Sequence, residues 1–67
     1  MTVEVHLDVR SPHVWSDDES ELDGVLKMLK DIHGLKKHSI IMKDLERGGF
    51  LFFLYQSIES EWISELV

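Results

Sequence analysis

The sequence predicts a small α+β domain in which the elements follow the order β-α-β-β-α. Three observations predict it: an alternating apolar pattern near the start, a stripe of apolar residues at helical spacing, and two apolar runs separated by paired glycines. The chain has 67 residues without a linker or an internal repeat, so we expect residues 1–67 to form one domain with a thin core. It has no cysteine, which excludes disulfides and thiolate-bound zinc as stabilising features.

The first element is a predicted strand. Residues 3–9 alternate apolar and polar side chains, the pattern of a strand with one buried and one solvated face. Ser11 and Pro12 end it, because proline lacks a backbone N–H and restricts the residue before it.

A helix is predicted over residues 17–33. Ser16 and Glu19 have the spacing of a capping box, and Gly34 is a suitable C-terminal stop. The residues that would form its buried stripe are Leu22, Val25, Leu26, Leu29 and Ile32.

A hairpin and a second helix complete the prediction. Residues 38–45 and 50–55 are rich in apolar and β-branched side chains, and Gly48 and Gly49 between them favour a tight turn. Residues 58–67 indicate a short helix capped by Ser57. We expect a three-stranded sheet in the spatial order first, third, second, with both helices on one face.

The charge balance favours a protein partner with a basic surface. Seven basic and 13 acidic residues give a net charge of −6, which opposes direct binding to nucleic acids and to anionic membranes. The carboxylates group at the starts of the two predicted helices, where they would recognise a basic surface by imitating a phosphate track, or would only satisfy helix dipoles and keep the surface solvated. The candidate charged contact residues are Asp17, Asp18, Glu19, Glu21, Glu59, Glu61 and Glu65.

The third predicted strand is apolar on both faces. Two short helices on one side of a sheet cannot cover both faces, so the other face either is shielded by long side chains or forms an interface. A structural homodimer, or a complex subunit, associating through this hairpin is therefore the alternative function. The candidate apolar contact residues are Phe50, Phe52, Phe53 and Trp62.

The sequence does not predict an enzyme, and we expect no catalytic residue, cofactor or functional metal. It has no nucleophile motif, and Gly48-Gly49 lacks the rest of a phosphate-binding loop. His6 beside Glu4 and Asp8 would hold a metal only weakly, because a metal site usually needs three or four converging ligands. With no signal-peptide pattern and no apolar run of about 20 residues, we expect a soluble, cytoplasmic protein.

The chain resembles the DinI-like family of small acidic modulators of the recombinase RecA in the bacterial SOS response. The residues that carry the resemblance are Met1, Glu4, Val5, Ser11, Pro12, His38 and Ile63-Ser64-Glu65. The resemblance implies the β-α-β-β-α order and an acidic C-terminal helix, here Glu59, Glu61 and Glu65, that docks on a recombinase filament. DinI-like proteins continue beyond the position of Val67, and the acidic weight of this chain lies at the first helix instead.

Overall fold

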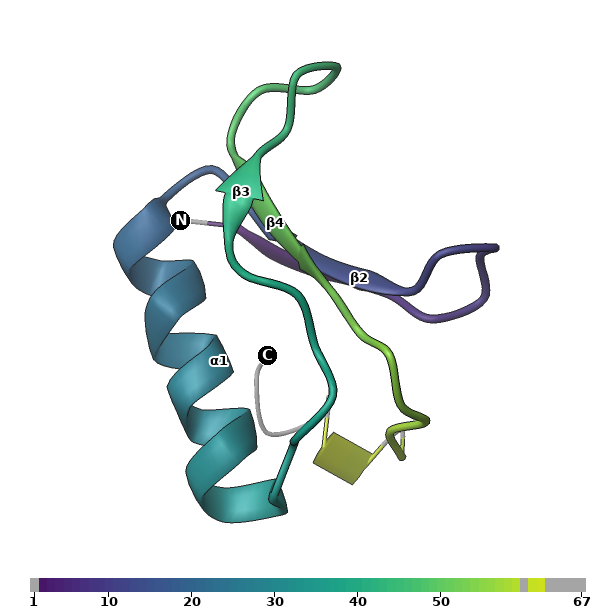
Figure 1. Ribbon diagram of the computed structural model, residues 1–67. Helices are drawn as coiled ribbons and strands as arrows, with labels where there is room; N and C mark the ends of the chain where they lie inside the picture. Colours follow the sequence, from purple (N-terminus) through teal and green to yellow (C-terminus); the bar gives the residue numbers. More distant parts are fainter. Residues whose placement is uncertain (1, 60, 63–67) are drawn as a thin grey trace.

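The computed structural model describes residues 2–59, 61 and 62, which form a body of 28 × 24 × 19 Å. Its elements are four short strands and one helix (Figure 1): β1 (Val3–His6), β2 (His13–Ser16), α1 (Glu19–His33), β3 (Met42–Lys43) and β4 (Phe50–Phe53). The predicted α+β class is confirmed.

The sheet is antiparallel throughout and has the strand order β1-β2-β4-β3. The α1 helix covers one face and contacts β2 and β4, the two inner strands. The predicted three-stranded order of first, third, second is therefore wrong, although the strand that starts at Phe50 is an inner strand as expected.

The prediction missed β2, and this omission changed the topology. The chain leaves β1 at His6, turns, and returns so that His13 pairs with His6 and Ser16 pairs with Val3. Pro12 therefore precedes a second strand rather than a helix. Ser16 does not cap α1: it lies fully buried in β2, and its Oγ accepts a hydrogen bond of 3.2 Å from the N–H of Asp18.

The predicted helix is present and begins two residues later than expected. Asp18 is the N-cap and accepts a hydrogen bond from the N–H of Ser20. Gly34 ends the helix in the left-handed conformation at φ 70°, as its position predicted. Of the predicted stripe, Leu22, Val25 and Leu29 are buried, whereas Ile32 is 63% exposed.

The predicted hairpin between the last two strands is present. Gly48 and Gly49 both have positive φ, and β3 pairs with β4 through Met42↔Leu51 and Lys43↔Phe50. The strand expected over residues 38–45 is interrupted by a bulge. His38 pairs with Leu54, so residues 39–41 lie opposite residues 52 and 53 only.

The start predicted for the second helix, residue 58 with Ser57 as its cap, is wrong, because residues 57–59 are not helical. The rest of the predicted helix falls partly outside the described residues, since 60 and 63–67 are not among them. Glu61 and Trp62 form a helical turn in which the Trp62 N–H donates a bond of 3.0 Å to the Glu59 carbonyl. The Trp62 indole stacks on the His33 ring at 4.7 Å, and Ile58 and Trp62 both pack against the core.

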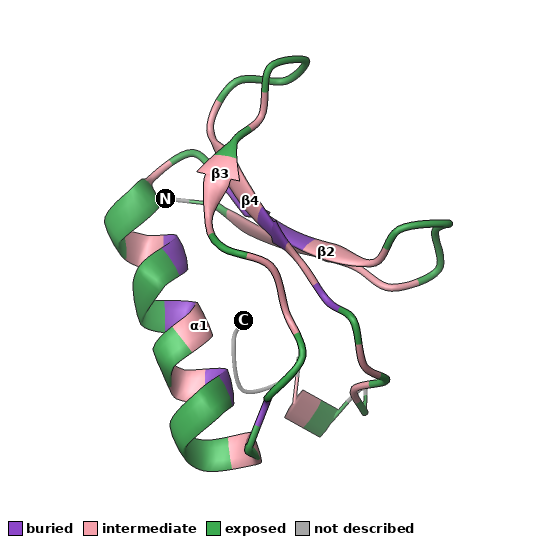
Figure 2. Ribbon diagram, viewed as in Figure 1, coloured by how far each residue is buried: buried purple, intermediate pink, exposed green. Residues whose placement is uncertain are grey.

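The core lies between α1 and the face of the sheet that the helix covers (Figure 2). Its buried members are Val14, Leu22, Val25, Leu29, Leu35, Phe52 and Leu54. In the described part of the chain, the α1 helix is too short and too polar to cross a membrane.

Candidate functional site

Three exposed carboxylates gather at the amino-terminal half of α1. Asp17 precedes the helix, Glu19 is its first residue, and Asp23 follows one turn later. Within the described residues, none of the three forms an ion pair with a lysine or arginine of this chain. We call Asp17, Glu19 and Asp23 the α1 acidic surface; its negative charge is available to a partner.

Asp18 and Glu21, the other predicted carboxylates of this region, are less available. Oδ1 of Asp18 accepts bonds from the Ser20 hydroxyl, at 2.7 Å, and from the Ser20 N–H, at 2.9 Å. These bonds lower the pKa of Asp18, the hydroxyl contributing most. Glu21 is half-buried, and its Oε2 is buried without a hydrogen-bond partner. Asp18 therefore has a structural role as the helix cap.

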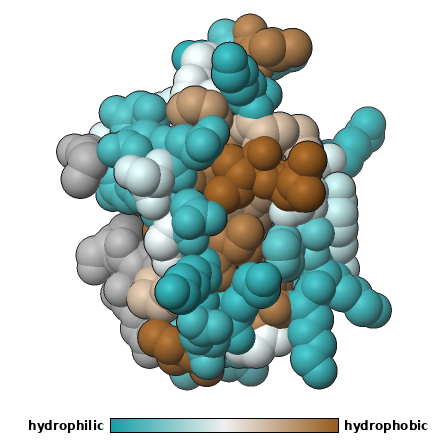
Figure 3. Space-filling model, turned by 60° about the vertical axis from the view of Figure 1, so that its left-hand side comes forward, coloured by the Kyte–Doolittle hydropathy of each residue, from teal (hydrophilic) through white to brown (hydrophobic). Residues whose placement is uncertain are grey.

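A groove beside the α1 acidic surface joins negative charge to apolar side chains. Its volume is about 660 Å³; one wall belongs to α1, and the other to the segment that leads into β3. The lining residues are Glu19, Ser20, Asp23, Leu26, His38, Ile40 and Ile41. Ile40 is 78% exposed, and Figure 3 shows apolar surface framed by hydrophilic side chains on this side of the molecule. We call this depression the α1–β3 groove.

The carboxylates predicted near the end of the chain lie elsewhere. Glu59 and Glu61 are exposed and belong to the segment that packs at the His33 end of α1. A helix of 15 residues is about 22 Å long, so this end is far from Glu19. Glu65 lies outside the described residues. The two acidic groups predicted from the sequence therefore belong to separate surfaces.

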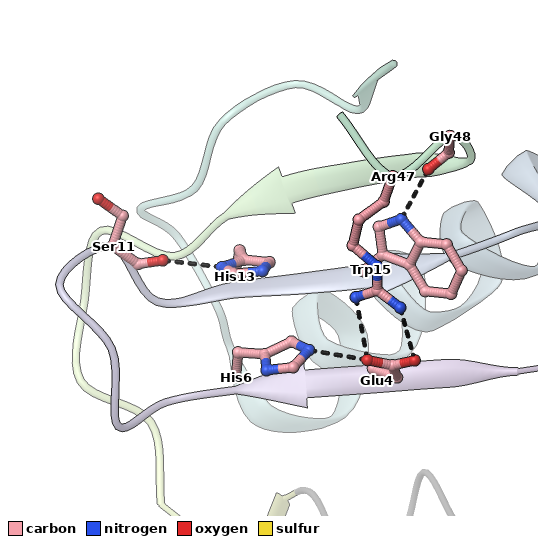
Figure 4. Close-up of polar contacts among 7 residues, drawn as sticks. All are labelled: Glu4, His6, Ser11, His13, Trp15, Arg47 and Gly48. Atoms are coloured by element: carbon pink, nitrogen blue, oxygen red, sulfur yellow. Dashed lines mark hydrogen bonds and ion pairs between the residues drawn. The ribbon is translucent and has the colours of Figure 1, made fainter. Parts of the chain in front are cut away.

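The opposite face of the sheet carries a cluster of aromatic and charged side chains (Figure 4). The Arg47 guanidinium donates two bonds to the Glu4 carboxylate, at 3.0 and 2.9 Å, and lies 3.9 Å from the centroid of the Trp15 ring. The Trp15 indole N–H in turn donates to the Gly48 carbonyl at 2.9 Å. The hydrogen bonds from Arg47 and then His6 lower the pKa of Glu4 from 4.5 to about 2. The cluster fixes the β3–β4 turn onto β1 and β2.

Two histidines extend this cluster along the sheet. His6 Nε2 donates to Glu4 at 3.0 Å, and its ring stacks on His13 at 4.8 Å. His13 Nδ1 donates to the Ser11 carbonyl at 2.8 Å. Among the described residues, no three histidine or acidic side chains converge as metal ligands.

A second groove, of about 650 Å³, lies on this face between the two hairpin loops. Its lining includes the apolar Met42, Leu51 and Phe53. Two lining residues of the loops expose apolar side chains: Val9 is 46% exposed and Leu45 is 94% exposed. This is the face of the sheet that α1 does not cover, for which the sequence left two alternatives: shielding by long side chains or an interface. We call it the open face.

The structure separates the four predicted apolar contact residues. Phe52 is fully buried in the core, so its assignment to an interface is wrong. Phe50 and Trp62 are half-buried and pack against that core, whereas half-buried Phe53 lines the groove of the open face. The error arose because a strand that is apolar on both faces does not reveal which face its helix covers.

Several residues of the two surfaces were not predicted as contact residues. Asp23 belongs to the acidic run in the sequence, but its neighbour across the groove, Ile40, is brought there by the bulge. The Trp15–Arg47 contact required β2, which was not predicted from the sequence.

No protein-family model, curated protein or solved structure matches this chain.

Proposed function

We propose that this protein is a non-enzymatic binding module whose α1 acidic surface docks on a basic surface of a partner protein. The observation that carries the proposal is the position of Glu19 and Asp23 in the same groove as Ile40 and Ile41. Unpaired negative charge guides a basic partner to the site, and exposed apolar surface beside it holds the partner once water is displaced.

The proposal is supported by the lack, among the described residues, of an ion pair to Asp17, Glu19 or Asp23. Arg47 is committed to Glu4 across the sheet, and Arg10, Lys43 and Arg47 all border the groove on the opposite face. Lys27 and Lys30 of α1 line a pocket together with Asp23, but in the described part of the chain neither forms an ion pair with it. A partner that supplies lysine or arginine gains ion pairs at little cost in broken intramolecular pairs.

A capture experiment tests this function. The immobilised protein is exposed to a bacterial lysate and washed at about 50 mM and then about 500 mM salt, which shortens the screening length severalfold. Wild type should retain a protein at low salt and release it at high salt. A triple variant, Asp17→Asn, Glu19→Gln and Asp23→Asn, should not retain it.

A second triple variant controls for net charge. Asp8→Asn, Asp31→Asn and Glu46→Gln remove the same charge from exposed positions outside the α1–β3 groove. This control should retain the partner as wild type does. Equal loss in both triple variants, or capture that ignores salt, would contradict the proposal.

A bacterial recombinase is the specific partner that the DinI-like resemblance suggests. In that version Glu59, Glu61 and Glu65 contact the filament and Trp62 anchors the contact. Binding of the labelled protein to a RecA filament on single-stranded DNA tests this version. Loss of binding in Glu59→Gln/Glu61→Gln, with the α1 triple variant unaffected, would assign recombinase docking to the end of the chain; no binding by wild type would exclude it.

Self-association through the open face is the second candidate function. It is favoured by Leu45, which is 94% exposed at the rim of a groove floored by Leu51 and Phe53. Sedimentation equilibrium at micromolar concentration should then give a dimer that Leu45→Ser dissociates. A wild-type protein that sediments as a monomer would exclude this function.

A further inference from the structure

We infer that the outer edge of β3 accepts an extended, basic peptide segment of a partner, which adds a fifth strand to the sheet and places side chains in the α1–β3 groove. This inference rests on the proposed function, because it specifies how the partner's basic surface is presented. The backbone of the edge strand would hold the peptide by main-chain hydrogen bonds, and the carboxylates of the groove would favour a basic peptide.

The outer edge of β3 has backbone groups without hydrogen-bond partners. β3 lies at the end of the strand order, with β4 on one side only. Among the described residues, the N–H and C=O of Ile41 have no hydrogen-bond partner. Asp44 N–H bonds to the Gly49 carbonyl at 3.0 Å, so the alternation of antiparallel pairs directs the N–H and C=O of Lys43 outward. Ile41 and Lys43 therefore present two consecutive outward positions to an incoming strand.

The bulge determines where pairing begins. His38 pairs with Leu54 in one register and Met42 pairs with Leu51 in a register shifted by one residue. Ser39 replaces the missing backbone bond with its side chain, since its Oγ accepts the Phe53 N–H at 2.7 Å. Edge strands with bulges resist long edge-to-edge pairing. The added strand is accordingly short and centred on Ile41 to Lys43.

The groove determines which side chains the added strand carries. Alternate side chains of a strand next to β3 project toward α1, where Leu26 and Ile41 offer apolar surface. Glu19 and Asp23, both exposed on the helix wall, face the same space. In the segment that fits, the residues that reach the groove lie two positions apart and include both lysine or arginine and an aliphatic residue, while the residues between them face the other side. Strand addition of this kind combines main-chain bonds for affinity with side-chain pockets for selectivity.

The charge of the groove disfavours a second copy of this chain as the occupant. Pairing of two β3 edges would bring Glu19 and Asp23 of one molecule toward those of the other. Like charges placed opposite each other destabilise such a pairing. The same carboxylates attract a cationic segment, so charge complementarity selects the basic peptide.

The probe is a synthetic peptide of about six residues, Lys-Thr-Val-Thr-Lys-Thr, because lysine and valine then occupy successive positions on the face that meets the groove. Titrated into the 15N-labelled full chain, it should shift the amide resonances of Ile41 and Lys43 together with those of Glu19 to Leu26. The fully N-methylated form of the same peptide keeps the charges and side chains but cannot donate main-chain bonds. It should bind at least tenfold more weakly.

A matched pair of variants tests the edge from the protein side. Lys43→Pro removes both the positive charge and the outward backbone N–H. Lys43→Thr removes the positive charge but keeps the backbone N–H. Both changes remove a cation that would repel the probe, so loss of binding in Lys43→Pro cannot come from charge. We expect Lys43→Thr to bind as wild type or better, and Lys43→Pro to bind at least tenfold more weakly.

The results of these titrations test strand addition and charge-based docking separately. Equal binding of the two peptides, or of the two Lys43 variants, would overturn strand addition and leave charge-based docking intact. Peptide binding that is unchanged in Glu19→Gln/Asp23→Asn would overturn the acidic docking and leave strand addition. Concentration-dependent shifts of Ile41 and Lys43 without peptide would assign the edge to a second copy and overturn the basic segment. If Lys43→Pro does not fold, the N-methylated peptide decides.

Discussion

The Trp15 indole N–H donates a hydrogen bond of 2.9 Å to the carbonyl oxygen of Gly48, which lies 33 residues further along the chain. The next residue, Gly49, lies so close to β2 that a Cβ atom there would be 2.6 Å from the Ser16 carbonyl oxygen and 2.9 Å from Cζ2 of Trp15. The turn between β3 and β4 is therefore packed directly on the strand that the sequence analysis missed.

Gly49→Ala should destabilise the protein strongly. The residue has φ +72°, and a side chain in this conformation costs about 1–2 kcal/mol before the contact with the Ser16 oxygen is counted. Urea denaturation should give a loss of about 2 kcal/mol or more in the free energy of unfolding. Gly24→Ala is the matched control: apart from the helix's own backbone, nothing lies within 4 Å of a Cβ atom built at Gly24. This change should raise the free energy of unfolding by about 0.5–1 kcal/mol. Equal effects at the two glycines would contradict the close approach.

Acid should remove the contribution of Glu4 to stability. Its pKa is about 2 in the folded protein and 4.5 ordinarily, because Arg47 and then His6 bond to the carboxylate. A group whose folded pKa is depressed stabilises the protein fully above its ordinary pKa, and the effect disappears as the pH falls through the folded pKa. The difference in melting temperature between wild type and Glu4→Gln should thus be constant above pH 4.5 and shrink toward pH 2. Arg47→Gln should lose the same pH-dependent part; a difference that stays constant down to pH 2 would argue against the pair.

Truncation of Phe52 should be far more damaging than truncation of Phe53. Phe52 is fully buried against the core, so Phe52→Ala leaves a cavity and should cost about 3–5 kcal/mol, if the variant folds at all. Phe53 is half-buried on the open face, so Phe53→Ala should cost about 1–2 kcal/mol. Thermal unfolding of the two variants measures the difference. Similar losses would mean that the faces of β4 are assigned incorrectly.

The sequence predicted those elements whose signals are local. The apolar stripe of α1, the Gly34 stop and the glycine turn before β4 each depend on spacing or on a backbone conformation that few residues adopt. In this fold the tertiary contacts leave these local features in place. Of the four carboxylates predicted at the start of α1, Asp17 and Glu19 lie on the α1 acidic surface, whereas Asp18 caps the helix and Glu21 is half-buried.

The strand β2 could not be predicted, because its pattern has a tertiary cause. Its inward residues are Val14 and Ser16, and a buried serine breaks the apolar alternation that marks a strand. Its outward Trp15 is buried only because Arg47 and the β3–β4 turn cover it. Ser16 and Glu19 also match a capping box, which hid the strand behind a helix signal.

The bulge at residues 39–41 limited the prediction of the site in a similar way. Its register shift depends on a side-chain bond from Ser39 to the backbone of β4, which no spacing in the sequence indicates. Ile40, in the middle of the bulge, is 78% exposed and lines the same groove as Asp23. Exposed apolar surface beside the acidic residues is therefore a property of the fold.

The salt dependence of partner affinity tests the central claim most directly. The dissociation constant of the partner captured by wild type is measured between about 50 and 500 mM salt for wild type, the α1 triple variant and the control triple variant. We predict that wild type and control lose about tenfold or more in affinity over this range. The α1 triple variant should bind weakly throughout and respond little to salt. An affinity that is the same in all three proteins, or that is indifferent to salt in wild type, would contradict the claim that the α1 acidic surface binds the partner.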